Sequence, residues 1–171
     1  MSLASVRAFL AEHAPDIEVL EATTSTATVA LAAEAHGVTP AEIAKTLSLS
    51  LNGEPILLVM SGEARLDNRK YKARFGAKAK MLGADDVLAA TSHPVGGVCP
   101  IGLPRPLKVY ADRSLARFTV VVPAAGDTHH AMRITPERLV RLAGAEWVDV
   151  AQAPGAAEAE TAAAGAPEQA P

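Results

Sequence analysis

Leucine and serine alternate along residues 45–51, which read KTLSLSL. In an extended strand the three leucines would face one side and the two serines the other. The dipeptide Asn52-Gly53 follows, which is favoured in two-residue hairpin turns, and the apolar run 55–61 (PILLVMS) comes directly after it. The pattern therefore predicts an antiparallel β-hairpin.

Apolar residues at helical spacing predict further elements on both sides of this hairpin. Leu3, Val6, Phe9 and Leu10 give an amphipathic first helix, with Ser2 as its cap. Helices are also predicted at 26–36, from 39 onwards, and at 67–75, 85–91 and 135–143, and strands at 78–82, 107–110, 118–123, 132–134 and 146–150. Short strands and helices of mixed placement indicate an α+β fold rather than a doubly wound sheet.

Several of these helices have recognisable ends. Gly37, Gly76 and Gly144 follow predicted helices, at the position where glycine can adopt the left-handed conformation that terminates a helix. Thr39 and Glu42 have the spacing of a capping box, with proline at the first helical position between them.

The end of the chain differs in composition from the rest. Residues 152–171 consist almost wholly of Ala, Glu, Gly, Pro, Gln and Thr, without a large apolar side chain. Nothing there offsets the entropy lost on ordering, so we expect a disordered tail at 152–171 after one folded domain at 1–151.

Composition and charge narrow the class of function. The chain has 171 residues, of which 49% are hydrophobic and only 4% aromatic, so aliphatic side chains and alanine must fill its core. The formal net charge of −3 argues against a general electrostatic binder of nucleic acid, and we expect no DNA partner. Residues 65–80 are locally basic, which is typical either of a solvated helix face or of a phosphate-contacting patch.

The sequence contains one cysteine, Cys99, so an intrachain disulfide is excluded. The first residues lack the apolar run of a signal peptide, and no segment has the length of a membrane span. We therefore expect a soluble, cytoplasmic protein without a membrane partner.

Three places carry residues suited to chemistry. Lys45 opens the alternating strand, either as a solvated edge residue or as a cation directed into a cleft. Residues 93–102 (HPVGGVCPIG) are dense in glycine, and such a loop can present successive N–H groups to a developing oxyanion. Residues 126–130 (GDTHH) offer carboxylate and imidazole groups for substrate binding or proton transfer.

Two further roles are disfavoured by the pattern. The neighbouring His129 and His130 would point to opposite faces of an extended segment, and no second cluster has zinc spacing, so we expect no metal. A lone cysteine such as Cys99 is more often a small buried hydrophobe than a nucleophile, which would need a base beside it.

Taken in order, four motifs resemble one known family: STAT at 25–28, AKTL at 44–47, GGVCPIG at 96–102 and AGD at 125–127. The chain resembles the YbaK family, which includes the editing domain inserted in bacterial prolyl-tRNA synthetases. The sequence GDTHHAMRI at 126–134 is similar to free-standing members of the ProX type and departs from the glycine-rich sequence of the YbaK branch itself.

The resemblance implies a YbaK-like α+β fold, with a bent, barrel-like, mostly antiparallel mixed sheet flanked by short helices. In it, Lys45 matches the invariant lysine of the family, and residues 96–100 match its GxxxP loop. The residues expected to take part in catalysis are Lys45, Gly96, Gly97, Val98, Cys99 and Pro100, and those expected to bind substrate are Ser25, Thr26, Thr46, Gly126, Asp127 and His129.

The resemblance also implies an activity, the hydrolysis of the ester that joins a wrong amino acid to tRNA. The expected substrate is tRNA(Pro) carrying alanine, cysteine or a similarly small amino acid, with no cofactor, and the expected partners are the mischarged tRNA and prolyl-tRNA synthetase. The alternative is a non-catalytic module that binds tRNA or a synthetase, because a fold does not fix a function.

Overall fold

A long β-hairpin forms the centre of the structure, a computed structural model that describes residues 2–153. β2 (Ile43–Leu51) and β3 (Glu54–Ser61) pair in antiparallel fashion along their whole length. Asn52 and Gly53 between them have φ angles of 53° and 84°, because both central residues of such a tight turn must be left-handed. The predicted hairpin is confirmed, and β2 begins two residues before Lys45.

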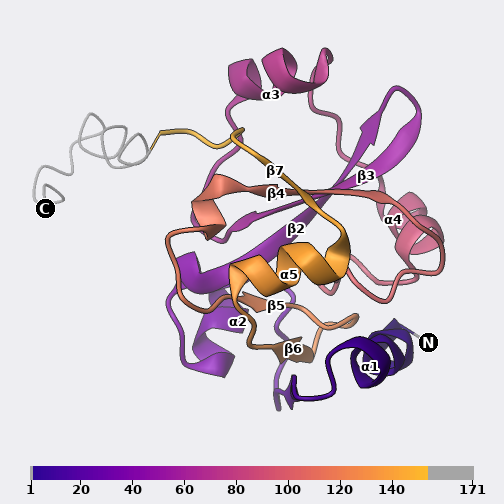
Figure 1. Cartoon of the computed structure of the whole chain (residues 1–171), viewed down its shortest axis with the longest axis vertical. Coiled ribbons are helices and arrows are strands. Elements are labelled where there is room, and N and C mark those ends of the chain that lie inside the picture. The colour runs from indigo at the N-terminus through magenta and orange to yellow at the C-terminus, as the bar shows by residue number, and fades with distance from the viewer. Residues whose placement is uncertain (1, 154–171) are drawn as a thin grey trace, which may run out of the picture.

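The hairpin lies inside a curled five-stranded sheet with the order β5-β2-β3-β4-β7. The strands added to it are β5 (Val122–Pro123), β4 (Lys108–Asp112) and β7 (Glu146–Val148), and each of their pairings within residues 2–153 is parallel. A second small sheet pairs β1 (Val19–Glu21) with β6 (His130–Met132) in antiparallel fashion. The α+β class and the bent mixed sheet are confirmed (Figure 1). The sheet was expected to be mostly antiparallel, but in the five-stranded sheet only the hairpin pairs so, because the strands added to it arrive after helices and long connections.

Short helices surround the sheet. Those described are α1 (Ser2–His13), α2 (Val29–His36), α3 (Asn68–Phe75), α4 (Ala84–Thr91) and α5 (Pro136–Ala143), with single 3₁₀ turns η1 (Pro40–Glu42) and η2 (Arg113–Leu115). Gly37, Gly76 and Gly144 end three of the helices in the left-handed conformation, as predicted. The Glu42 carboxylate accepts the Thr39 N–H at 2.9 Å, but the helix expected there is only the turn η1 before β2 begins.

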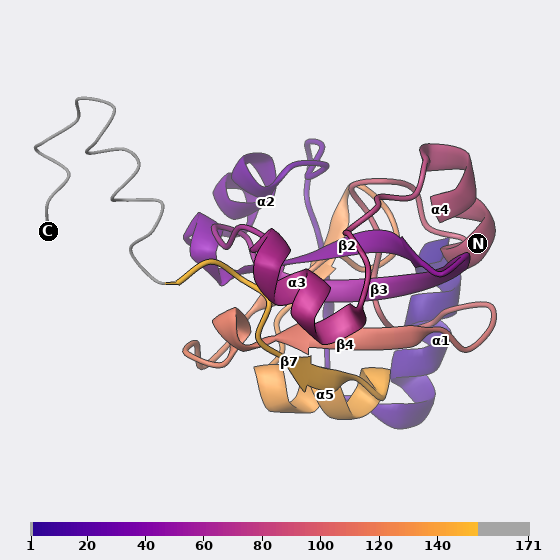
Figure 2. The ribbon, with the colours of Figure 1, turned by 90° about the horizontal axis from the view of Figure 1, so that it is seen from above.

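Both faces of the sheet are buried, which explains the unbroken apolar run of β3. Leu57 and Val59 face a cluster that includes Val6 of α1 and Leu139 of α5. The alternate residues of β3 face a second cluster, under Tyr71 of α3 and together with the three leucines of β2. α3 lies across β3 and β4 on that side of the sheet (Figure 2).

Several predicted boundaries were wrong. α2 begins at Val29 because the Thr28 hydroxyl accepts the Leu31 N–H and caps the helix there. The strand expected at 78–82 is a single bridge between Met81 and Leu49. The strand expected at 132–134 lies instead at 130–132, the one expected at 118–123 is reduced to β5, and β1 was not predicted.

The chain's end is described as far as residue 153. The Gln152 N–H donates to the Arg65 carbonyl at 2.8 Å, and Ala151 bridges to Leu66. The tail prediction otherwise falls on residues 154–171, which lie outside the described part of the chain. No helix among residues 2–153 combines the length and the apolar character that a bilayer span requires.

A buried histidine supports the glycine-rich loop that connects α4 to β4. The His93 ring is inaccessible to solvent, and its Nδ1 accepts the Cys99 N–H at 3.1 Å. The Thr91 hydroxyl accepts the His93 N–H and donates to the Val87 carbonyl, which joins the loop to the end of α4. Burial lowers the pKa of His93 to about 4, so the neutral ring with its proton on Nε2 is the form present at neutral pH.

This histidine should make the stability of the protein depend on pH. In the unfolded chain His93 takes up a proton near pH 6.5, whereas in the folded chain it does so only near pH 4. The free energy of unfolding is therefore fully retained above pH 6.5 and falls as the pH drops from 6.5 towards 4, by up to roughly 3 kcal/mol. His93→Gln, whose amide oxygen can still accept the Cys99 N–H, should lose this part of the pH dependence. Urea denaturation of both proteins between pH 7 and pH 4.5 measures it, and parallel pH profiles would contradict the assignment.

Candidate functional site

A small cavity of about 170 Å³ opens between the segment before α2, the start of β2 and the glycine-rich loop. The motifs at 25–28, 44–47 and 96–102 each contribute residues to its wall, whereas residues 126–129 do not. The predicted site residues that line it are Thr26, Lys45, Thr46, Gly96 and Val98. The lysine at the start of the alternating strand and the glycine turn after α4 therefore meet at one cavity.

Three loops, around residues 26–27, 96–97 and 127–128, pack closely against one another beside this cavity. At Gly96 and Gly97 the approach leaves no room for a side chain. A Cβ on Gly97 would lie 2.5 Å from the backbone carbon of Asp127, and one on Gly96 would lie 2.7 Å from the Ala27 oxygen. The Thr26 N–H and hydroxyl both donate to the Thr128 carbonyl, at 2.6 and 2.8 Å. Glycine is required at 96 and 97 because only a residue without a side chain permits this approach.

The backbone N–H groups of the glycine-rich loop are divided into two sets. The Gly97 N–H donates to the Pro94 carbonyl at 2.9 Å, and the Cys99 N–H donates to His93. Within the described chain, the N–H groups of Gly96 and Val98 have no hydrogen-bond partner, and these are the two residues of the loop that line the cavity. The loop thus has two donors without a partner, on the two of its residues that line the cavity.

The other residues of this loop lie behind the wall. Cys99 is fully buried, and burial raises the pKa of its thiol to about 12. A thiol with such a pKa carries almost no thiolate at neutral pH, and the thiolate is the nucleophilic form. Gly97, Cys99 and Pro100 do not line the cavity.

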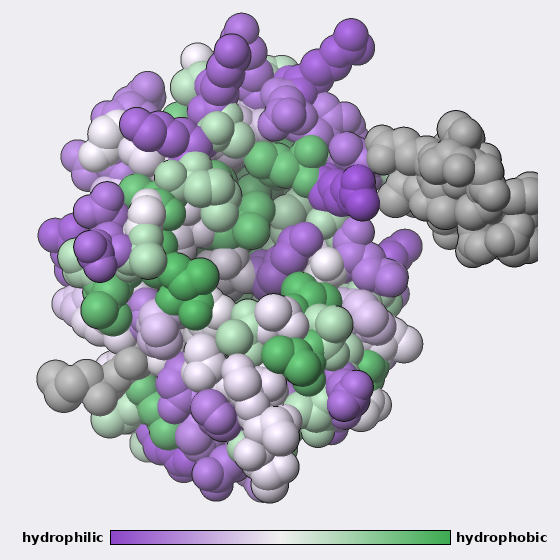
Figure 3. Space-filling view, turned by 180° about the vertical axis from the view of Figure 1, so that it is seen from behind, coloured by the Kyte–Doolittle hydropathy of each residue, from purple (hydrophilic) through white to green (hydrophobic). Residues whose placement is uncertain are grey.

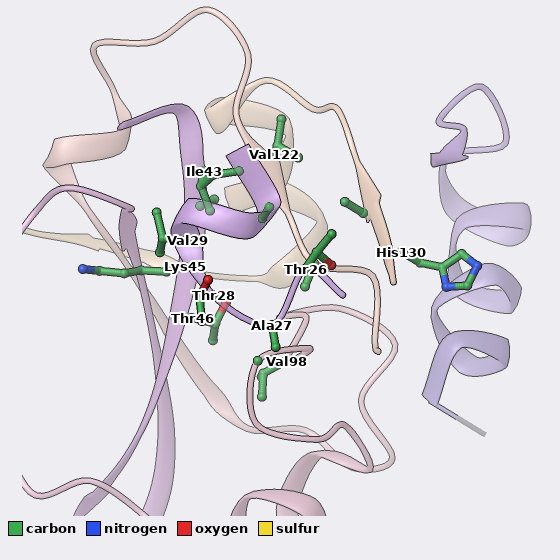
Figure 4. Close-up of a pocket in the computed structure, with 15 residues that line it drawn as sticks. Thr26, Ala27, Thr28, Val29, Ile43, Lys45, Thr46, Val98, Val122 and His130 are labelled. Atoms are coloured by element: carbon green, nitrogen blue, oxygen red, sulfur yellow. The ribbon is translucent and has the colours of Figure 1, made fainter. Parts of the chain in front are cut away.

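Lys45 is half-buried, and its ammonium lies at the outer edge of the cavity. Its Nζ donates to the carbonyls of Ala64 at 2.6 Å and Gly62 at 3.3 Å. Burial, and then the nearby charge of Arg65, lower the pKa of Lys45. Its side chain extends away from the other lining residues (Figure 4), and one of its three N–H donors remains available to a ligand.

The next residue of β2, Thr46, has a buried hydroxyl at the cavity wall. Its Oγ1 has no hydrogen-bond partner among the described residues. Buried polar atoms are nearly always paired, so an unpaired one beside a cavity is typical of a position that a ligand or water completes. Sequence reasoning placed Thr46 among the substrate-binding residues; the residue lines the cavity, and its role stays a prediction.

The acidic and histidine side chains after β5 lie at one side of the cavity rather than in it. Asp127 accepts the His129 N–H at 2.8 Å and contacts the His130 ring at 2.8 Å. Partial burial acts to raise the pKa of Asp127, but these hydrogen bonds outweigh it and hold the pKa below its usual value. His130 lines the cavity, yet its ring points away from the other lining residues (Figure 4). Ser25, Gly126, Asp127 and His129 do not line it.

The sequence reasoning missed the apolar part of the wall. Small and branched aliphatic residues from four different elements or loops form it, namely Val29, Ala32, Ile43, Val122 and Ala131. Most of them belong to one apolar cluster between α2 and the strands. Nothing in the local pattern marks them, because each has the same apolar character as ordinary core residues. Hydrophobic side chains also gather in a hollow between hydrophilic ones on the face seen in Figure 3.

The proteins of similar sequence include a free-standing bacterial protein and proline–tRNA ligases. The uncharacterised protein YwhH of Bacillus subtilis (strain 168) is 43% identical over 152 residues, which cover 88% of this chain and 97% of YwhH. The proline–tRNA ligase of Citrifermentans bemidjiense is 35% identical over 96 residues. That match covers 54% of this chain but only 17% of the ligase.

A solved structure and a family model are likewise related to tRNA editing. A crystal structure described as a candidate trans-editing enzyme for prolyl tRNA synthetase superimposes with a TM-score of 0.81 at 30% identity, over 88% of this chain and 97% of that one. The sequence model of the aminoacyl-tRNA editing domain matches residues 23–142, the segment that contains every predicted site residue. The chain therefore belongs to the aminoacyl-tRNA editing domain family, which includes the YbaK proteins and the editing region of prolyl-tRNA synthetases.

Proposed function

We propose that this protein is a trans-editing aminoacyl-tRNA deacylase, which acts in the cytoplasm on tRNA(Pro) carrying alanine, cysteine or a similarly small amino acid. The observation that supports it best is the meeting of Lys45, Gly96 and Val98 at one small cavity. Family membership supplies the reaction class, and the cavity supplies a place for the ester.

The need for such an enzyme follows from the limits of binding selectivity. A synthetase pocket that accepts proline cannot strongly reject a smaller amino acid, since one methylene group is worth only about 1–3 kcal/mol. A second hydrolytic site that admits the small product and excludes the correct one removes the error. The cavity of about 170 Å³ is smaller than the roughly 300–1,000 Å³ of drug-sized ligand pockets, which suits a single aminoacyl group.

The proposed reaction uses water and no nucleophile from the protein. The N–H groups of Gly96 and Val98 hold the ester carbonyl oxygen as it becomes an oxyanion. Water attacks the carbonyl carbon, the bond to the ribose oxygen breaks, and a proton passes to that oxygen through the neighbouring ribose hydroxyl. Lys45 holds the terminal ribose or its phosphate, and the Thr46 hydroxyl hydrogen-bonds the substrate. An aminoacyl ester is already activated, so positioning and oxyanion stabilisation supply most of the acceleration.

The aliphatic wall favours a small apolar side chain in the cavity. Val29, Ala32 and Ile43 offer neither donors nor acceptors in their side chains, so a polar side chain placed against this part of the wall would lose its hydration without compensation. Alanine meets this condition best, and a cysteine thiol forms only weak hydrogen bonds.

A deacylation panel tests the function directly. The purified protein is incubated with alanyl-, cysteinyl- and prolyl-tRNA(Pro), and the released amino acid is counted. We expect alanyl-tRNA(Pro) to be hydrolysed at least about tenfold faster than prolyl-tRNA(Pro), because the cavity selects a small side chain. Binding of these tRNAs without any hydrolysis would favour the non-catalytic module, and hydrolysis of prolyl-tRNA(Pro) alone would contradict the size selection.

Lys45→Ala should reduce kcat/KM for the preferred aminoacyl-tRNA by about 100-fold or more, as expected when a charged group acting on the reacting end is removed. Lys78→Ala is the matched control, since Lys78 is exposed and lines neither the cavity nor its rim. Thermal melting should show that both variants fold. Full activity of a folded Lys45→Ala protein would remove this lysine from the mechanism.

Cys99→Ala should retain activity within about threefold of the wild type, while its free energy of unfolding falls by about 1 kcal/mol because a buried sulfur is lost. The physical reason is the burial that keeps the thiol protonated and away from the cavity. Initial rates on alanyl-tRNA(Pro) at a temperature well below the melting transition measure it. A complete loss of activity in the folded variant would restore the covalent route.

A further inference from the structure

A second, larger depression lies next to the candidate active site. Its volume is about 1,130 Å³, and its wall consists of the turn after β3, the 3₁₀ turn η2 and residues 149–153. We call it the basic groove, because its cationic side chains outnumber its acidic ones. The cations are Lys45, Arg65, Lys70, Arg113 and Arg117, against three carboxylates.

Two of the three carboxylates are already engaged within the fold. Asp112 is buried, and its two oxygens accept the N–H groups of Ser114 at 2.8 Å and Val150 at 2.7 Å. Asp149 pairs with the Lys70 ammonium at 3.1 Å. The remaining acidic group is the exposed Glu63, so positive charge prevails along the groove.

Two arginines are left without acidic partners. Arg113 and Arg117 are both exposed, and among the described residues neither forms an ion pair. They lie four positions apart around η2, and the Arg117 guanidinium stands 4.9 Å from the ring centre of Phe118. Exposed guanidinium groups without a carboxylate partner are suited to phosphate, which they bind through two parallel hydrogen bonds.

Lys45 connects the groove to the cavity, since it lines both. Its Nζ donates to the carbonyls of Gly62 and Ala64, two residues of the groove wall. An aminoacyl group held in the cavity is joined to a ribose at the end of an RNA strand. A strand that leaves the cavity beside Lys45 enters the groove, because this residue lines both.

We propose that the basic groove binds the sugar–phosphate backbone of the single-stranded RNA end that carries the ester, with Arg113 and Arg117 contacting its phosphates. This inference rests on the proposed function for the identity of the strand. It accounts for a tRNA-binding protein with a formal net charge of only −3, because the attraction is local to one groove. Phosphate contacts of this kind position the strand and carry no sequence information.

Binding of uncharged tRNA tests the groove without any hydrolysis. The probes are a tRNA(Pro) transcript and the same transcript without its single-stranded 3′ end, each titrated with the protein by fluorescence anisotropy. Arg113→Gln/Arg117→Gln should weaken binding of the full transcript about tenfold. It should also lower the slope of log Kd against log salt by about 1.4, the value for two single-strand phosphate contacts. Binding of the truncated transcript should change less than twofold.

Arg105→Gln/Arg141→Gln is the matched control, since it removes the same charge from exposed positions outside the groove and the cavity. The control should bind both transcripts as the wild type does. Equal weakening of the full and truncated transcripts, wild-type affinity of the groove variant, or no binding of the full transcript by the wild type would each overturn the proposal. A groove effect in a protein that hydrolyses no aminoacyl-tRNA would instead remove the deacylase function and leave the groove as an RNA site.

Discussion

The candidate active site depends on the contact of three loops through their backbones. Gly97 lies against the backbone of Asp127, Gly96 lies against Ala27, and Thr26 donates twice to the Thr128 carbonyl. Because Gly96 and Gly97 approach these backbones within 3 Å of where a Cβ would lie, a single methyl group added at either glycine would separate the loops. Among the described residues the N–H groups of Gly96 and Val98, which line the cavity, are unpaired, whereas those of Gly97 and Cys99 are engaged within the loop. A site made of backbone donors depends on this close packing, because the position of a backbone N–H is set by the path of the chain and not by the identity of a side chain.

The hairpin strand β2 directs two neighbouring polar side chains, those of Lys45 and Thr46, to different parts of the site. Successive residues of a strand point to opposite faces, and Lys45 and Thr46 are successive residues of β2. The Lys45 ammonium reaches the turn after β3 and the basic groove, whereas the unpaired Thr46 hydroxyl lies at the cavity wall. One strand therefore supplies both the cation between the cavity and the groove and the unpaired hydroxyl at the cavity wall.

The cavity and the groove divide recognition between two kinds of force. In the proposed function the cavity selects the aminoacyl group chiefly by its small size, and both aliphatic residues and threonines form its wall. The groove is wide and cationic, and in the proposal it attracts a phosphate backbone through forces that weaken with salt. The buried His93 acts on neither ligand, but it fixes the Cys99 N–H and so supports the loop that borders the cavity. The contact between the Asp127 carboxylate and the His130 ring stabilises the loop after β5 in a similar way.

The sequence by itself determined the hairpin, the helix ends at Gly37, Gly76 and Gly144, the α+β class and the family, because these depend on local spacing, on turn chemistry and on ordered motifs. It also indicated Lys45 and the glycine-rich loop. Only the tertiary structure decided that Gly96 and Val98 line the cavity while Gly97 and Cys99 do not, since this depends on contacts with residues far along the chain. The aliphatic wall and the basic groove were decided in the same way. Their residues come from separate segments, and an apolar or basic side chain looks the same in a sequence whether it fills the core, meets solvent or faces a ligand.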